Sequence, residues 1–402
     1  MSPLLALDPL LIDVDFTVVL ITVVKVVVAF ALLLVSVMLM IWFERKLHAD
    51  MSNRLGPTIA GPFGVLQTLA DGVKAFFKED LLPEKADPFV FRLAPYLSLV
   101  PAFLVFTVIP IAGNFDGGGN GVVRIAGHDT LVQLADPHIG ILLVLAMSSL
   151  AVYGVMLAGW SSGSKYPLLG AVRATAQMVS YEAALGLSLL AVLLRSESLS
   201  TNAIVGSQGT WQWNLWMTGL VPFVVFLIAT TAELNRPPFD LVEAEQELVG
   251  GFHTEYSGVR FAMFYLSEFM NVVTMSAVIV TLFLGGPAGP SFGLTGWVAD
   301  YVLPFVWFFL KLMVLLVTFV LFRTTLPRLR YDQLMDLGWK LLIPLALAWF
   351  LLLAGLKVGL DEDWSWAWVA VAAVAGLALG GALLLKAVRT AERRRDLEGV
   401  TT

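Results

Sequence analysis

Long apolar runs separated by short polar connections cover almost the whole chain. Nine of them approach the ~20 residues that a helix needs to cross a hydrocarbon core of ~30 Å. They lie at about residues 16–43, 89–112, 139–159, 171–194, 216–232, 262–284, 302–322, 341–357 and 364–386. None shows the alternation of apolar and polar residues typical of strands in a membrane β-barrel. The pattern therefore predicts an all-α, polytopic transmembrane helical bundle with about nine membrane spans.

The composition supports this pattern and excludes an ordinary soluble protein. Of the 402 residues, 58% are hydrophobic and 14% are charged, and the mean hydropathy is +0.82. A soluble chain of this length would need far more polar surface. We expect a single integral membrane domain over residues 1–402. The start of the chain has no basic n-region and no small-residue cleavage site, so the first span itself is expected to direct insertion.

Lysine and arginine are unevenly distributed between two sets of loops. The first, third, fifth and seventh loops, together with the tail from Lys386, hold 19 of the 25 basic residues. The other four loops hold Arg124 and Arg195. Because basic residues gather on the cytoplasmic side of a membrane, we predict that the N-terminus lies outside and the C-terminus is cytoplasmic.

The chain has no cysteine, and its four histidines are scattered over loops of both predicted sides. Without cysteine there is no thiolate-held iron–sulfur cluster, no disulfide and no cysteine nucleophile. The histidines show no metal-ligand spacing, and no Gly-rich phosphate loop follows a strand. No metal site is expected in this chain, and electrons for any redox chemistry must come from a partner.

The longest loop, residues 44–88, contains an amphipathic segment. Its apolar residues recur at helical spacing with charged residues between them: Leu66, Leu69, Val73, Phe76 and Phe77, with Asp71, Lys74 and Lys78. Such a helix suits the membrane surface. A helix packed on the bundle with a solvated outer face is the compatible alternative. The preceding Gly- and Pro-rich stretch predicts a tight turn, and the basic tail KAVRTAERRRDLEG predicts an anchor to anionic lipid.

Three glutamates lie within the predicted spans. Glu182 is in the fourth span, Glu233 closes the fifth, and Glu268 lies near the start of the sixth. A charge at bilayer depth costs at least about 2.5–3.5 kcal/mol, so each glutamate needs an explanation. A satisfied ion pair or hydrogen bond is one explanation. The three residues cluster on the predicted cytoplasmic half, however, and neighbouring carboxylates at low dielectric share protons. Their placement therefore favours a proton relay.

Residues 232–258 concentrate acid next to a predicted helix break. Six carboxylates share this segment with Arg236. The two prolines of NRPPFD fix φ and are expected to interrupt the fifth helix just after Glu233. A solvated acidic loop is the simpler interpretation, but the apolar residues between the acids disfavour it. Irregular backbone at membrane depth is tolerated where it lines a polar cavity, which is what we expect here.

Two long segments resemble one known family. AELNRPPFDLVEAEQELVGGFHTEYSG (232–258) and ERKLHADMSNRLGPTIAGPFGVLQTLADGVKAFFKED (44–80) resemble motifs of the H subunit, the mitochondrial ND-one type, of proton-pumping NADH:quinone oxidoreductase, respiratory complex I. The resemblance runs through about the first eight spans, over residues 1–340 and the eighth span to residue 360. The chain departs from many relatives at Ser52 and Asn53, and its predicted ninth span, within residues 361–402, exceeds the family's usual eight.

The resemblance implies a protein at the junction of the membrane arm and the redox arm, in a bacterial plasma membrane. Members of the family help to form the chamber in which ubiquinone or menaquinone is reduced, and they are not catalytic alone. The implied chamber residues are Arg45, Asp71, Lys74, Arg236, Glu243, Glu245 and Glu247. The implied start of a proton path toward the antiporter-like subunits is Glu182, Glu233 and Glu268.

The implied substrate is a quinone, and the implied cofactors, iron–sulfur clusters and FMN, belong to partner subunits. The expected partners are the redox-arm subunits at the quinone site, the small and antiporter-like membrane subunits, and lipid, with no nucleic acid. One alternative is the homologous membrane subunit of a proton-pumping membrane-bound hydrogenase or related dehydrogenase, although the complete first motif favours a quinone enzyme. The other is a secondary transporter, which the lack of a convincing inverted repeat disfavours.

Overall fold

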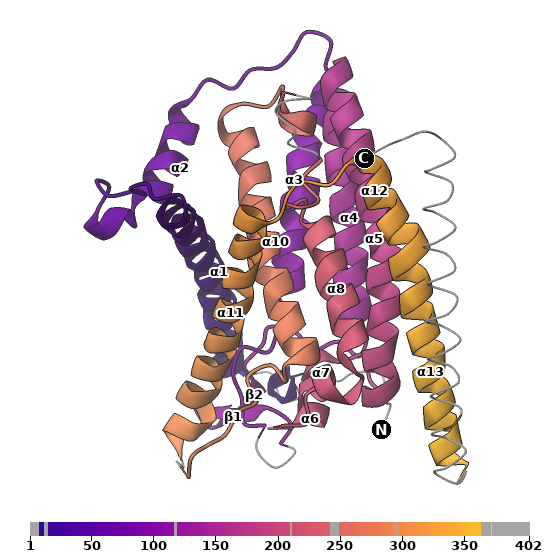
Figure 1. Ribbon diagram of the computed structural model, residues 1–402. Coiled ribbons are helices and arrows are strands. Elements are labelled where there is room, and N and C mark those ends of the chain that lie inside the picture. Colours follow the sequence, from indigo (N-terminus) through magenta and orange to yellow (C-terminus); the bar gives the residue numbers. More distant parts are fainter. Residues whose placement is uncertain are drawn as a thin grey trace.

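The computed structural model describes residues 8–11, 15–115, 119–209, 211–241, 249–293, 296–362 and 371. Within these ranges the protein is a bundle of long helices with one small hairpin (Figure 1). The predicted ninth span, apart from residue 371, and the basic tail lie outside the described residues. The acidic residues Glu243, Glu245 and Glu247 lie outside them too.

Seven helices of the described part are long and apolar enough to cross a membrane. This confirms the all-α, polytopic prediction, whereas the number of nine spans and the orientation stay predictions. The long helices are α1 (Phe16–Met51), α3 (Pro88–Phe106), α4 (Gly140–Ser161), α5 (Lys165–Ser196), α10 (Gly258–Phe283), α11 (Leu303–Thr325) and α13 (Ile343–Asp361).

Shorter elements connect the long helices. The short α-helices are α2 (Gln67–Phe77), α6 (Thr201–Gln208), α7 (Asn214–Met217), α8 (Leu220–Glu233) and α12 (Tyr331–Asp336). Single turns lie at η1 (Pro9–Leu11), η2 (Pro62–Gly64) and η4 (Gly251–His253), and π-helical turns precede α11 and α13 at η5 (Val298–Val302) and η6 (Leu337–Leu342). The amphipathic helix predicted in the first long loop is α2, which contacts both α1 and α10 at the edge of the bundle (Figure 1).

Helix α10 forms the centre of the core. In its most apolar window 83% of the residues are buried, against 17% for α1 and 11% for the helix that ends in α13. Helix α10 packs against α3, α1 and α11, while α4, α5 and α8 complete the bundle on the side of α3 (Figure 1). The largest buried side chains of the bundle include Met270, Ile279 and Phe283. The exposed apolar faces of α1 and α13 are suited to lipid or to other apolar protein.

Helix α8 is the fifth predicted span, and it ends part of the way across the bundle (Figure 1). It stops at Glu233, directly before the segment that contains the two prolines, as predicted. Gln177 on α5 compensates for the break, because its amide nitrogen donates to the carbonyl oxygen of Ala232 at 2.6 Å and to Asn235 Oδ1 at 3.2 Å. The first of these bonds gives a donor to a carbonyl at the C-terminus of the helix, where the last carbonyl oxygens have no partner within the helix.

The hairpin consists of β1 (Val122–Ile125) and β2 (His128–Leu131), paired antiparallel. Its two-residue turn has positive φ at Ala126 (49°) and Gly127 (89°), the geometry that suits the twist of a hairpin. This element was not predicted from the sequence. We call the region around β1, β2, α6 and α7 the hairpin end.

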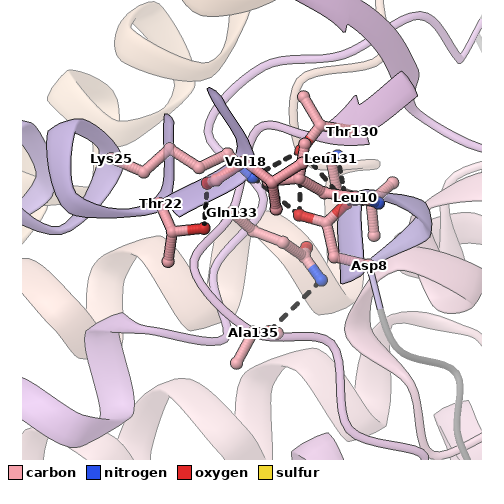
Figure 2. Close-up of polar contacts among 9 residues, drawn as sticks. All are labelled: Asp8, Leu10, Val18, Thr22, Lys25, Thr130, Leu131, Gln133 and Ala135. Carbon is pink, nitrogen blue, oxygen red and sulfur yellow. Dashed lines mark hydrogen bonds and ion pairs between the residues drawn. The ribbon is translucent and has the colours of Figure 1, made fainter. Parts of the chain in front are cut away.

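Two lysines within the predicted spans have hydrogen-bond partners at the hairpin end. Figure 2 shows Lys25 on α1, whose Nζ lies 2.7 Å from Asp8 Oδ2 and donates to Thr130 Oγ1 at 2.6 Å. Asp8 also accepts from the backbone nitrogens of Leu10 (3.1 Å) and Leu131 (3.3 Å). The segment that precedes α1 is thereby tied to the hairpin.

The second lysine, Lys311 on α11, binds backbone oxygens. Its Nζ donates to the carbonyl oxygens of Leu284 (2.7 Å), Gly286 (2.9 Å) and Ala288 (2.7 Å), and it lies 5.0 Å from the centroid of the Trp213 ring. A cation at the C-terminus of α10 also interacts favourably with the helix dipole. Lys311 therefore holds the chain that follows α10 against α11.

Candidate functional site

Arg236 occupies the centre of a buried charge network made by elements distant in sequence. It belongs to the irregular segment after α8 and is 6% exposed. Its Nη1 donates to Glu44 Oε1 on α1 at 2.9 Å, and its Nε lies 3.0 Å from Glu268 Oε1 on α10. Its guanidinium also stacks over Phe269, 4.4 Å from the ring centroid. The structure thus brings together Arg236, which the resemblance assigned to the quinone chamber, and Glu268, which it assigned to the proton path.

Glu44 has a second cationic partner. Arg323, at the end of α11, forms an ion pair with the carboxylate of Glu44. Glu44 is 5% exposed, so two arginines compensate a charge that burial would otherwise make costly. A movement of Arg236 would leave Glu44 with Arg323, and it would take away the cation that pairs with Glu268. The two carboxylates are therefore expected to respond differently to such a movement.

A second charge pair connects α1 with the amphipathic helix α2. Arg45 Nη1 lies 2.5 Å from Asp71 Oδ2, and Gln67 donates to Asp71 Oδ1 at 3.0 Å. Both charged side chains are partly exposed. Lys74 is one turn further along α2 and is exposed, without an ion pair to a described residue. The structure therefore brings Arg45 and Asp71 together and leaves Lys74 apart from them.

The two remaining glutamates of the predicted path contact neighbouring serines of α4. Ser148 Oγ hydrogen-bonds Glu233 Oε1, and Ser149 Oγ hydrogen-bonds Glu182 Oε1. The second oxygen of Glu233, Oε2, is buried and has no hydrogen-bond partner among the described residues. One helix thus connects the carboxylates of α5 and α8 through adjacent side chains.

A cavity joins the charge network to the carboxylate of Glu233. Its lining includes Glu233, Asn235, Tyr265, Glu268 and Asn271. A smaller cavity that also borders Glu233 is lined by Ser148, Asn271 and Thr274. Because Glu233 and Asn271 belong to both linings, polar groups follow one another from α10 toward α4. We call the residues Glu44, Glu182, Glu233, Arg236 and Glu268 the acidic site.

Several polar atoms in this region have no hydrogen-bond partner among the described residues. They are Ser98 Oγ, Thr274 Oγ1, Glu233 Oε2 and Arg236 Nη2. A buried polar group without a partner costs about 1–3 kcal/mol, and such groups in native proteins commonly bind water. The arrangement is therefore suited to hydrated side chains that exchange protons.

An apolar cavity of about 290 Å³ lies between α1, α10 and α11. Its lining includes Leu39, Phe43, Ala277, Phe309 and Leu316. An apolar cavity with this lining is suited to a hydrocarbon chain. It lies on α1 and α10, the helices that also carry Glu44 and Glu268.

Several residues of the site were not predicted from the sequence. Ser148 and Ser149 lie in an apolar span, and no local pattern separates them from serines that bond their own helix. Arg323 was counted as a loop residue, although it ends an apolar run shortly before Pro327. Glu44 lies directly after the first apolar run, and its pairing with Arg236 joins residues 192 positions apart.

Comparisons with known proteins give one consistent result. A family model described as NADH dehydrogenase matches residues 24–354. The H subunit of the NADH-quinone oxidoreductase of Frankia alni is 48% identical over 385 residues, covering 93% of this chain and 83% of the relative. An H subunit of the same enzyme from Geobacter metallireducens is 49% identical over 328 residues, covering 81% and 92%. The H subunit from Streptomyces avermitilis is 46% identical over 367 residues, covering 90% and 78%.

Proposed function

This chain belongs to the NADH dehydrogenase family, and from that premise we propose that it forms part of a quinone chamber and couples quinone reduction to proton translocation. It is a multi-pass membrane protein of a family whose relatives are H subunits of an oxidoreductase complex. Quinone is the proposed substrate, with FMN and iron–sulfur clusters on partner subunits. The proposed location is the bacterial plasma membrane.

One observation carries the proposal: Glu268 and Glu233 line the same cavity while Arg236 pairs with Glu268. The proposed chamber side comprises Arg45, Asp71, Lys74 and Arg236, together with Glu243, Glu245 and Glu247. The proposed path runs from Glu268 through Glu233 to Glu182. Among the described residues, Arg45 pairs with Asp71 and Arg236 pairs with Glu268. The assignment of Lys74 to the chamber rests on the motif alone.

The charges suggest how coupling starts. Reduction of a quinone to a quinol takes up protons and changes the charge near Arg236. If Arg236 moves, Glu44 keeps its ion pair with Arg323, whereas Glu268 loses the compensation that Arg236 gives it. A carboxylate in an apolar setting takes up a proton more readily when a neighbouring cation leaves. Glu268 is therefore the group that passes the change on to Glu233.

The proposed partners are the redox-arm subunits at the quinone site and the small and antiporter-like membrane subunits, with membrane lipid around them. The names of the relatives refer to quinone oxidoreductases, which favours this function over the membrane subunit of a hydrogenase. Nickel-binding cysteine motifs in the large partner subunit would reverse that preference. Ion uptake by the isolated chain in proteoliposomes would instead support a secondary transporter.

Two variants in the reconstituted complex test the proposal. Asp71→Asn removes the carboxylate that pairs with Arg45, and we expect it to slow quinone reduction. Glu233→Gln removes a titratable group of the path, and we expect it to lower proton pumping. The matched control is Glu197→Gln, because Glu197 lies beyond the end of α5 and pairs with Lys357. Wild-type quinone reduction and pumping in fully assembled variants would contradict the proposal.

A further inference from the structure

The two serines of α4 differ in their hydrogen-bond partners. Ser149 Oγ has two acceptors: Glu182 Oε1 and the carbonyl oxygen of Leu145, at 3.0 Å, one turn earlier on its own helix. Ser148 Oγ bonds Glu233 Oε1. Adjacent residues on an α-helix point in directions about 100° apart, which lets one serine reach α8 and the next reach α5.

A hydroxyl carries one proton, so Ser149 cannot donate fully to both of its partners. When Glu182 is ionised, Ser149 donates to the carboxylate. When Glu182 is protonated, the carboxylic acid donates to Ser149, and the serine proton turns to the carbonyl oxygen of Leu145. Both arrangements satisfy the hydroxyl and the carboxyl group with the same positions of the heavy atoms. The geometry accommodates both the protonated and the ionised form of Glu182.

We propose that Ser149 is a positioning residue that switches its hydrogen bond between Leu145 and Glu182 as Glu182 gains and loses a proton, while Ser148 orients Glu233 for the same exchange. The inference rests on the proposed function, because it assumes that Glu182 and Glu233 carry protons. In the exchange, the carboxylic acid of Glu233 loses a proton and the carboxylate of Glu182 gains it. No other bond to carbon or oxygen forms or breaks.

The charged groups around the pair come from three elements. Glu182 lies on α5, and Glu233 lies at the end of α8. Glu268 on α10 shares the cavity of Glu233 and is paired with Arg236. Ser148 and Ser149, which bond these carboxylates, are neutral. Replacing either serine therefore changes hydrogen bonding without changing charge.

Infrared difference spectroscopy on the assembled complex tests the switch. The carbonyl stretch of protonated Glu182 is identified as the band that Glu182→Gln removes. In Ser149→Ala that band should move to higher frequency, because the acid loses its hydrogen-bond acceptor, and proton pumping should fall about tenfold, the size expected when a charged group loses a hydrogen bond. Ser149→Thr keeps a hydroxyl that can bond the carbonyl one turn earlier, and it should restore both readouts.

Ser188→Ala is the matched control. Ser188 is a buried serine of α5 whose hydroxyl bonds the carbonyl oxygen of Leu185 on its own helix, at 2.7 Å. Its replacement should leave the band and the pumping rate unchanged. If Ser149→Ala does not assemble, Ser149→Cys serves in its place, because a thiol is a weaker hydrogen-bonding group and should shift the band by a smaller amount in the same direction.

The outcomes separate the switch from the function on which it rests. If Glu182→Gln abolishes pumping but Ser149→Ala pumps normally with an unmoved band, the switch is wrong and the proton path stands. If Glu182→Gln pumps at the wild-type rate, the proposed path itself is wrong. Equal loss of pumping in Ser149→Ala and Ser149→Thr would also overturn the switch.

Discussion

Buried charged groups are differently paired at the acidic site and at the hairpin end. At the hairpin end, Lys25 contacts a carboxylate and a hydroxyl, and Lys311 contacts three carbonyl oxygens. At the acidic site, Glu233 Oε2 and Arg236 Nη2 are buried without a hydrogen-bond partner among the described residues. The two paired lysines hold helices and loops together. The incompletely paired groups lie beside cavities and remain able to exchange partners.

This difference separates structural charge from functional charge in one bundle. A fully paired ammonium gains nothing by moving, since every alternative leaves oxygens without donors. A carboxylate with an unbonded oxygen beside a cavity can take up a proton or a new partner at lower cost. Charges at bilayer depth are therefore not equivalent, and the number of their satisfied hydrogen bonds distinguishes the two kinds. We therefore expect replacements at the hairpin end to change stability and replacements at the acidic site to change coupling as well.

Replacing Arg236 should have the largest effect on stability. Arg236→Gln takes from Glu268 the cation that pairs with it and leaves Glu44 with Arg323. Removing one partner of a buried ion pair typically costs about 3–5 kcal/mol. We expect a lower yield of assembled complex and loss of quinone reduction in what assembles. Thermal unfolding followed in detergent measures the first effect. A stable variant with full activity would show that Arg236 is not central to the network.

Replacing Lys311 should reduce stability without affecting coupling. Lys311→Met keeps the length of the side chain and removes the donor for three carbonyl oxygens at the end of α10. A buried acceptor that loses its donor costs about 1–3 kcal/mol, and at the lower end of that range the three freed carbonyl oxygens give a total loss of about 3 kcal/mol. The protons pumped per quinone reduced should equal the wild-type ratio. A lower ratio in the assembled variant would assign Lys311 to the functional charges.

Replacing Asp71 should affect stability little and activity more. The Arg45–Asp71 pair is partly exposed, and such pairs contribute about 0.2–1 kcal/mol. The thermal unfolding of Asp71→Asn should therefore stay close to that of the wild type, while quinone reduction is slower. A large loss of stability with normal turnover would instead make the pair a structural link between α1 and α2.

The smallest effect is expected at Glu197, which is exposed and paired with Lys357. The hydrogen bond and charge of Lys357 lower the pKa of Glu197 below its ordinary value of 4.5. A lowered pKa stabilises the folded state above the unfolded pKa, and this contribution is lost as the pH falls through the folded pKa. Glu197→Gln should thus unfold slightly more easily than the wild type at neutral pH and match it at acidic pH. A difference in thermal unfolding that persists at acidic pH would contradict this assignment.

Much of the fold follows from local pattern. The long apolar runs predicted the long helices, and the prolines after Glu233 predicted the early end of α8, because both depend on residues close in sequence. The hairpin was missed, since its four-residue strands are shorter than the window that reveals a membrane span. Helix α1 continues to Met51, beyond the predicted limit at residue 43, because Glu44 and Arg45 are satisfied by contacts with α2, α11 and the segment after α8.

The site could be predicted only in part. Glu182, Glu233 and Glu268 were predicted because charge is costly at their depth, and Arg236 because it lies in the acidic segment next to the helix break. Their partners Glu44 and Ser148 come from other helices, as does Arg323, the second partner of Glu44. No local pattern specifies which helices pack together. The roles of Glu243, Glu245 and Glu247 stay predictions from the motif, since these residues lie outside the described part of the chain.

The most direct test of the central claim concerns Glu268, where the charge network and the cavity meet. The measurement is the number of protons translocated per quinone reduced, in reconstituted complexes that carry Glu268→Gln or the control Glu197→Gln. A glutamine keeps the shape of the side chain but cannot gain or lose a proton. We predict that Glu268→Gln lowers the ratio while the control keeps it. An unchanged ratio in a fully assembled Glu268→Gln complex would contradict the claim that the acidic site couples quinone reduction to proton movement.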